Sequence, residues 1–473
     1  MDTQAVQMQP NYIEESVPLE MDEGPPTDAV TAHKTTLRER ISCALLGIVL
    51  YFMDILTIGA IGLGNISGMD LPKYSKVMFL IGICSSQIIF FLFSSFTIGV
   101  ITTPISENFV TIAGVTEALS QVYKLEGSTL FWTLLVFIAM STLMTSFVFF
   151  ILYVTGFQKI LSKVPAEIGI ALFFVIGCFC CIFGNASSMK IADKMSSEIA
   201  RWSILVMYNG LALVSWGVAK LIARKFPKIG PFSYGLVLFA LIGLSYIPIL
   251  GVWGSIANAR KSEFLPPGGK SFFILFDLPL MMEFGLDKVA WSCIFTFDML
   301  LKMASIVIIN LVQFPVNMPA ISTGCRVAPS LKKELLANSV SNLFSSVFGG
   351  FSTYVVSSST IALNKGGPIT KKIDGLMSVV CFLALYLVGQ TAFSYVPQIC
   401  LDMLLLFIGF DILMDSVIGI WSKGLYTIIF SSAVAIPCLY LNNLPIGMAV
   451  GFGISLLVYL RKLQKQHLPL FKS

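Results

Sequence analysis

The chain has 473 residues, of which 56% are hydrophobic and only 12% are charged, and its mean hydropathy is +0.84. An average soluble domain has about a quarter charged residues. The composition therefore excludes a soluble globular protein, a disordered chain and a nucleic-acid-binding protein. A helix that crosses a bilayer needs about 20 apolar residues, so the chain can supply roughly fourteen of them. We expect an all-α polytopic membrane protein.

The side chains that perform most enzyme and metal chemistry are scarce in the hydrophobic part of the chain. The two His residues, His33 and His467, lie outside the hydrophobic runs, so a catalytic triad or a zinc site there would lack its His. Cys178, Cys180 and Cys181 have a metal-like spacing. They lie in an apolar run without a second ligand pair, and packing is favoured over metal binding. We expect no enzyme activity, no metal and no cofactor.

Three segments are expected along the chain. Residues 1–38 are acidic and contain prolines, which predicts a disordered cytoplasmic tail. Residues 39–462 form the predicted transmembrane transporter domain, and residues 463–473 a short cytoplasmic tail. We expect neither a signal peptide nor a C-terminal soluble domain.

Hydropathy predicts fourteen spans within the transmembrane domain. They are 41–63, 74–96, 101–121, 128–155, 166–184, 199–222, 232–250, 289–316, 331–349, 355–366, 373–392, 397–418, 424–441 and 444–461. With both termini placed in the cytoplasm, twenty basic residues fall on the cytoplasmic side and ten on the opposite side. This bias agrees with the tendency of Lys and Arg to remain on the cytoplasmic side.

The third and tenth spans are short, interrupted and rich in Ser and Thr. Thr102-Thr103-Pro104 interrupts the third, and residues 349–360, which begin with Gly349-Gly350, interrupt the tenth. Each predicts a short β-like stretch that leads into a half-helix. Because the interruptions occupy matching places in two halves of seven spans, they favour an inverted 7+7 repeat with its binding site at the breaks.

The hydroxyl side chains at these breaks are the first candidates for substrate binding. Half-helix N-termini present backbone N–H groups and a positive dipole end, and hydroxyls add donors and acceptors. The alternative is that they only mediate close helix packing. The candidate residues are Thr102, Thr103, Ser357, Ser358, Ser359 and Thr360.

Other polar groups within the spans are candidates for substrate binding, coupling or gating. Asp298 and Lys302 are four residues apart and form either a self-neutralising pair or a charge on the substrate path. Gln313 and Asn317 share a helix face, provided that the helix continues past Pro315. Two acids could bind a coupling cation or proton, or could be hydrogen-bonded structural acids. They are Asp54 and Glu107.

A family signature can be traced through the second half of the chain. Its elements are Leu331-Lys-Lys-Glu334-Leu335 with Asn342, then Gly349-Gly350, then Ser357-Ser-Ser-Thr-Ile-Ala-Leu-Asn364, then Gly366-Gly367. This order resembles the SulP (sulfate permease) anion-transporter signature, which reads roughly N-x-E-L, x-x-G-x-x-N, G-G, S-x-S-R-S-A-x-N and A-G. Residues 316–324 look like a divergent fungal branch, and residues 164–169 are similar to the family's P-x-x-V-x-x-G.

The resemblance implies a fold of seven plus seven spans, usually in a homodimer. A core domain (spans 1–4 and 8–11) would move against a gate domain (spans 5–7 and 12–14), with substrate between the two half-helices. Ser357, Ser359 and Thr360 would face the substrate, with Met53 and Asp54 nearby. Gln313 and Asn317 would fall where cation-coupled members place an acid and a hydroxyl.

The chain also departs from the family pattern. Thr360 replaces the Arg of the tenth segment, and Gln313 replaces the acid of the eighth span. We also expect the chain to lack the usual STAS domain. Sulfate selectivity and cation coupling would depend on the two replaced residues.

We therefore expect a secondary active transporter of a small inorganic or organic anion that works by alternating access. The alternatives are a transporter of a neutral or zwitterionic solute, such as a nucleobase or an amino acid, and an anion-channel-like protein. The expected partners are the small solute, the lipid bilayer and a second copy of the chain. The plasma membrane and a vacuole-like endomembrane both remain open as the location.

Overall fold

The computed structural model describes most of the hydrophobic part of the chain, including all of the two interrupted segments except residues 106, 107 and 366. The described residues are 71–105, 108–156, 166–185, 188–189, 197–226, 233–251, 254–261, 264–265, 285–365, 371–393 and 395–441, with single residues between 45 and 63 and between 450 and 457. The predicted tails, and most of the first and last predicted spans, lie outside these residues.

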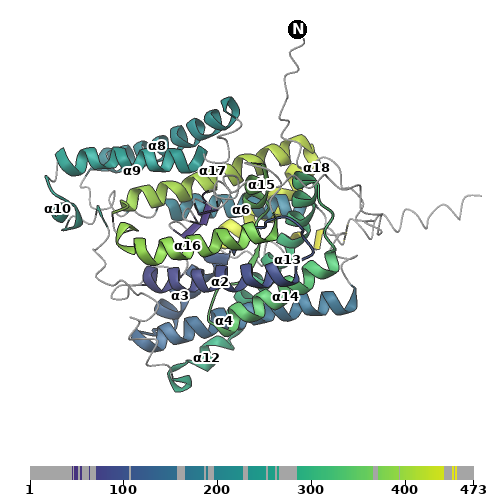
Figure 1. Cartoon of the computed structure of the whole chain (residues 1–473). Coiled ribbons are helices and arrows are strands. Elements are labelled where there is room, and N and C mark those ends of the chain that lie inside the picture. Colours follow the sequence, from purple (N-terminus) through teal and green to yellow (C-terminus); the bar gives the residue numbers. More distant parts are fainter. Residues whose placement is uncertain are drawn as a thin grey trace, which may run out of the picture.

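The described chain is almost entirely helical (Figure 1). In order, its elements are α2 (Leu71–Phe93), β1 (Thr102–Pro104), α3 (Asn108–Glu117), η1 (Ala118–Val122), α4 (Gly127–Thr155), α6 (Ala166–Gly184), α8 (Glu198–Lys225), α9 (Ser233–Gly251), α10 (Ile256–Lys261), η3 (Leu286–Lys288), α12 (Trp291–Ile294), α13 (Phe297–Cys325), α14 (Leu331–Val347), β2 (Thr353–Val355), α15 (Ser357–Lys365), α16 (Lys372–Phe393), α17 (Gln398–Ser422) and α18 (Leu425–Leu441).

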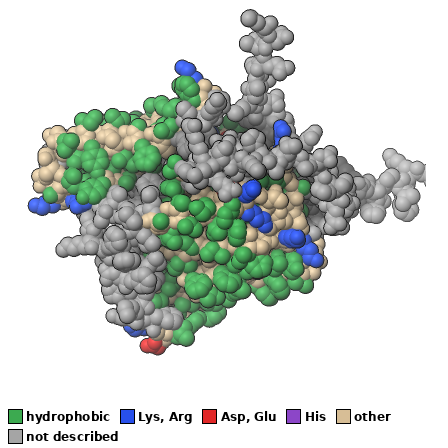
Figure 2. Space-filling view, in the orientation of Figure 1, with side chains coloured by type: hydrophobic (Ala, Val, Ile, Leu, Met, Phe, Trp, Pro, Cys, Tyr) green, Lys and Arg blue, Asp and Glu red, His purple; other side chains and the backbone are tan. Residues whose placement is uncertain are grey.

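Hydrophobic side chains dominate both the interior and the surface of this bundle. Four described helices are long and apolar enough to cross a membrane, within Tyr74–Phe93, Gly127–Thr155, Arg201–Lys225 and Phe297–Cys325. Figure 2 shows hydrophobic side chains over much of the visible described surface, with Lys and Arg at a few places along its edges and in a group right of centre. Such a surface suits lipid contact, and the prediction of a polytopic all-α membrane protein is confirmed at this level.

The helices pack in two groups. The central group consists of α2, α3, α4, α13, α14, α15 and α16 together with both strands, and its closest contacts pair α14 with α4 and α2. The flanking group consists of α6, α8, α9, α17 and α18, and its closest contacts pair α6 with α17 and α18. An apolar cluster joins the groups, with Ile105 and Ile309 from the central group and Val175, Phe430 and Val434 from the flanking group.

The eighth predicted span differs most from the helix that forms. The prediction was 289–316, whereas α13 begins at Phe297 and continues through Pro315 and Pro319 to Cys325. A proline inside a helix removes one backbone N–H donor. Within a membrane such positions are tolerated where neighbouring groups satisfy the freed backbone carbonyls, which in this helix are those of Leu311 and Pro315. The continuation past Pro315 places Gln313 and Asn317 on one face.

Candidate functional site

The two interrupted segments meet at the centre of the central group. β1 and β2 pair antiparallel, with Thr102 opposite Val355 and Thr103 opposite Tyr354. β1 precedes α3 and β2 precedes α15, so the predicted β-like stretches and half-helices are both present. Gly82 allows α2 to approach both strands closely, because a Cβ at this position would lie 3.1 Å from the Pro104 ring and 3.2 Å from a Thr353 methyl.

The side chains of Thr102 and Thr103 leave β1 on opposite faces, as in any strand. Thr102 is fully buried against α2, where its hydroxyl donates to Gln87 Oε1 at 2.9 Å and accepts from Ser86 Oγ at 2.8 Å. Gln87 also donates from Nε2 to the Val100 carbonyl at 2.9 Å. Thr102 thus holds the strand, whereas Thr103 lies on the face of Tyr354, which packs in the cluster between the groups.

The first turn of α15 is connected to both α13 and the chain before β1. The Ser357 N–H donates to Asn317 Oδ1 at 3.1 Å. Thr360 is fully buried, and its hydroxyl accepts from the Ile101 N–H at 3.1 Å. The Thr360 N–H donates to the Val356 carbonyl. Ser357 and Ser359 are half-buried, and the side chain of Ser358 lies outside the described residues.

A row of amide side chains follows α13 beside β2. Asn310, Gln313 and Asn317 have exposed fractions of 1%, 4% and 5%, and their spacing of three and four residues places them along one face. The Asn317 Nδ2 donates to Gln313 Oε1 at 2.9 Å. Asn310 was not among the predicted residues, although its place seven positions before Asn317 could have identified it.

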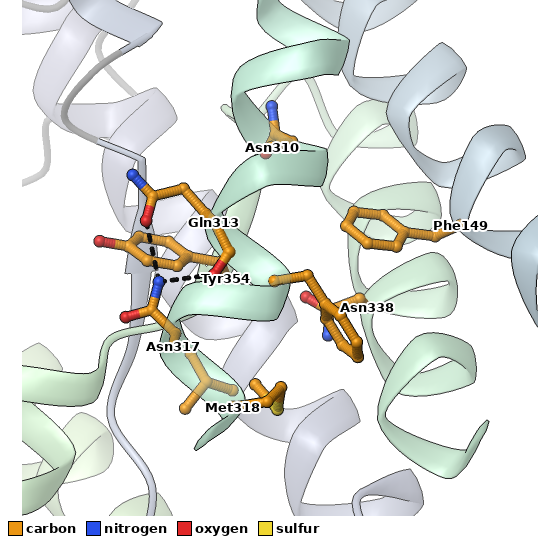
Figure 3. Close-up of a pocket in the computed structure, with 9 residues that line it drawn as sticks. Phe149, Asn310, Gln313, Asn317, Met318, Asn338 and Tyr354 are labelled. Atoms are coloured by element: carbon orange, nitrogen blue, oxygen red, sulfur yellow. Dashed lines mark hydrogen bonds between the residues drawn. The ribbon is translucent and has the colours of Figure 1, made fainter. Parts of the chain in front are cut away.

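These amides line a small cavity between α13, α14, α4 and β2. The space is partly open to its surroundings, and its wall includes Asn310, Gln313, Asn317, Asn338, Phe149 and Tyr354. Figure 3 shows Gln313, Asn317 and Tyr354 on one side of α13, with Phe149 and Asn338 on the other. Every described side chain in the wall is uncharged. In this conformation the space between these side chains holds about one water molecule.

The remaining predicted residues lie elsewhere. Asp298 and Lys302 form an ion pair of 2.7 Å in the first turns of α13, with exposed side-chain fractions of 49% and 20%. Lys302 is eleven positions before Gln313, or roughly 16 Å along the helix axis. Asp54 is half-buried on helical backbone, and Glu107 lies outside the described residues.

Comparisons with known proteins agree with this fold. Residues 278–434 match the family model described as the sulfate permease family. The chain is 23% identical over 415 residues to the vacuolar basic amino acid transporter VSB1 of Saccharomyces cerevisiae, an alignment that covers 83% of this chain and 38% of VSB1. The chain thus spans less than half of the length of this curated relative.

Two solved structures share the fold. The transmembrane domain of the cyanobacterial bicarbonate transporter BicA matches with a TM-score of 0.58 at 15% identity, over 89% of this chain and 98% of that one. The murine Solute Carrier 26 family member A9 anion transporter, in its inward-facing state, matches with a TM-score of 0.62 at 14% identity, over 91% of this chain and 69% of that one. At these identities the likeness concerns the fold alone.

Proposed function

Because the chain belongs to the sulfate permease family of transporters, we propose that it carries a small solute with a carboxylate group across a membrane by secondary active transport. An amino acid is the first substrate class to test. The observation that carries this proposal is the pairing of β1 with β2 beside an uncharged, amide-lined cavity. Broken helices that meet at a polar cavity are typical of transporter substrate sites.

A carboxylate suits the start of α15. Helix N-termini bind anions through backbone N–H groups and the dipole. The N–H groups of Ser357 and Thr360 already have acceptors, which leaves positions 358 and 359 as the candidate donors to substrate. The side of the strands that carries Thr103 and Tyr354 faces the flanking group through apolar side chains, so polar recognition is concentrated on the central group.

An inorganic anion is the second candidate. The solved relatives are named as bicarbonate and anion transporters, and a half-helix N-terminus can hold such an ion. Thr360, however, occupies the position where the family signature has Arg, and its hydroxyl is occupied by the Ile101 N–H. A carboxylate with further polar groups makes better use of the surrounding amides.

We propose alternating access as the mechanism, with the central group acting as the core and the flanking group as the gate. The boundary between the groups is apolar near β2, so movement there would not break hydrogen bonds between described residues of this cluster. The name of the yeast relative, a vacuolar transporter, supports an endomembrane location. Two copies of the chain, with cytoplasmic termini, are part of the same proposal.

Uptake by the full chain in proteoliposomes tests this function. The panel is lysine, arginine, leucine, uracil, sulfate, oxalate, bicarbonate and chloride, each with and without a pH gradient. We expect saturable uptake of a labelled amino acid. Unlabelled amino acid inside the vesicles should stimulate this uptake, because in alternating access the return of the loaded site couples efflux to uptake. Uptake of sulfate, bicarbonate or chloride alone would support the second candidate. Single-channel currents, or no uptake of any solute, would contradict the transporter mechanism.

A further inference from the structure

A second polar cluster lies one helical turn from Gln313, at the start of α3. Asn108, the first residue of α3, donates from Nδ2 to Ser352 Oγ at 2.8 Å. Asn310 of α13 donates from Nδ2 to the same oxygen at 3.3 Å. The three side chains have exposed fractions of 1% to 3%. The residue before β2 thus joins the α3 half-helix to the amide row of α13.

Two oxygens in this cluster have no hydrogen-bond partner among the described residues. They are Oδ1 of Asn108 and Oδ1 of Asn310. The orientation of the Asn310 amide is fixed, because its Nδ2 also donates to the Ile306 carbonyl at 2.6 Å. A buried acceptor without a donor is costly, so the cluster is suited to a ligand that brings N–H groups.

We propose that Asn108 and Asn310 accept hydrogen bonds from the cationic end of a basic amino acid, whose carboxylate lies at the start of α15. This inference rests on the proposed function and names the substrate class. Asn310 belongs both to this cluster and to the wall of the cavity, and its buried Oδ1 would become reachable when a bound solute widens the space beside α13. Amide oxygens bind an ammonium or guanidinium group without adding a charge to the membrane interior.

The spacing along α13 selects a long solute. Asn317, which contacts the first turn of α15, is seven residues from Asn310, or about 10 Å along the helix. The six bonds from the carboxyl carbon of lysine to its Nζ span roughly 7–8 Å when extended, and a hydrogen bond at each end covers the remainder. The α-ammonium group is only two bonds from the carboxyl carbon and cannot bridge this distance.

The experiment compares lysine with norleucine, which has the same carbon chain without the terminal ammonium group. Proteoliposomes with the full chain, Asn108→Leu, Asn310→Leu or Asn310→Asp are assayed for the ratio of lysine uptake to norleucine uptake at subsaturating concentration. We expect each Leu variant to lower this ratio about 10-fold, the factor that 1.4 kcal/mol produces. Asn310→Asp keeps the side-chain size and should raise the ratio, which covers the case that a Leu variant does not fold.

Asn209→Leu is the matched control, because Asn209 pairs with Asn185 in the flanking group. We expect its ratio to equal that of the unmodified chain. If the unmodified chain transports amino acids but the Asn108 and Asn310 variants keep its ratio, the inference fails while the proposed function stands. The inference also fails if these variants change only the dependence of uptake on Na⁺, since the cluster would then hold a metal cation. If the unmodified chain transports no amino acid, both fail.

Discussion

The central group and the flanking group are held together by different interactions. Inside the central group, polar side chains are buried and hydrogen-bonded: Asn342 accepts from the Thr353 N–H at 2.8 Å and donates to the Thr353 carbonyl at 3.1 Å. In the flanking group, α6 and α17 approach through glycines, with Gly177 against Leu413 and Gly409 against Cys181. Hydrogen bonds have defined directions, whereas packing through small residues mainly requires that the two helix backbones lie close together.

This difference suits the roles proposed for the two groups. A buried, hydrogen-bonded polar network specifies one arrangement, so the central group can keep the two strands and the substrate site in a fixed geometry. Helices packed through small apolar contacts can slide by small amounts, as in shear motions. The comparison therefore predicts that hydrogen-bond losses in the central group damage folding most, and that steric changes in the flanking group act on movement as well as stability.

The largest effect is expected at Glu334 of α14, which is fully buried. Its carboxylate accepts from the Ser95 N–H at 2.6 Å, from Ser95 Oγ at 2.7 Å and from Ser94 Oγ at 3.0 Å. Glu334→Leu leaves these donors without their acceptor and should cost several kcal/mol, because each buried donor left unsatisfied costs about 1–3 kcal/mol. The check is the yield of monodisperse protein and its melting temperature in detergent.

Glu198→Leu is the control for this change, because Glu198 is exposed at the start of α8. We expect near-normal melting for Glu198→Leu and an intermediate loss for Glu334→Gln, which keeps one acceptor oxygen. Equal melting of Glu334→Leu and the unmodified chain would show that the polar network of the central group does not stabilise it.

A smaller effect is expected at Gly409 of α17. A Cβ at this position would lie 2.8 Å from Cys181 Sγ and 3.1 Å from the Cys181 backbone nitrogen, so α6 and α17 must separate to admit a side chain. Gly409→Leu should cost roughly 1–3 kcal/mol, as overpacking does. Because the contact lies in the group that we propose to move, the maximal uptake rate should fall further than the melting temperature predicts.

Gly210→Leu is its matched control, since no atom lies within 4 Å of a Cβ built at Gly210 on α8. We expect this control to retain both uptake and stability. A Gly409→Leu protein with full uptake would argue against any movement that depends on close packing of α6 and α17.

The interrupted segments could be predicted from sequence because Ser, Thr, Gly and Pro break an apolar run in a recognisable way. The direction of each side chain could not be predicted. Neighbouring residues of a strand point to opposite faces, and only the pairing register decides which of them faces α2 and which faces the flanking group. The strand register directs the Thr102 hydroxyl to Gln87 and Ser86, and substrate binding by Thr102 stays a prediction. Asn108 and Asn310 are brought together by their shared hydrogen-bond acceptor, Ser352 Oγ, and Ser352 is far from both in sequence.

The smallest effect is expected at the exposed ion pair of the central group, Asp298 and Lys302. A variant of this pair tests whether a polar contact of the central group needs to be buried in order to affect stability or uptake. Exposed pairs four residues apart on a helix contribute about 0.3–0.5 kcal/mol. The double variant Asp298→Asn with Lys302→Gln removes both charges and leaves the local charge balanced. We expect unchanged uptake and a melting temperature close to that of the unmodified chain, because the pair lies roughly 16 Å along α13 from Gln313. If this variant instead lost uptake while its melting temperature stayed unchanged, the pair would belong to the substrate path. Burial would then not distinguish the polar side chains that function in transport from those that do not.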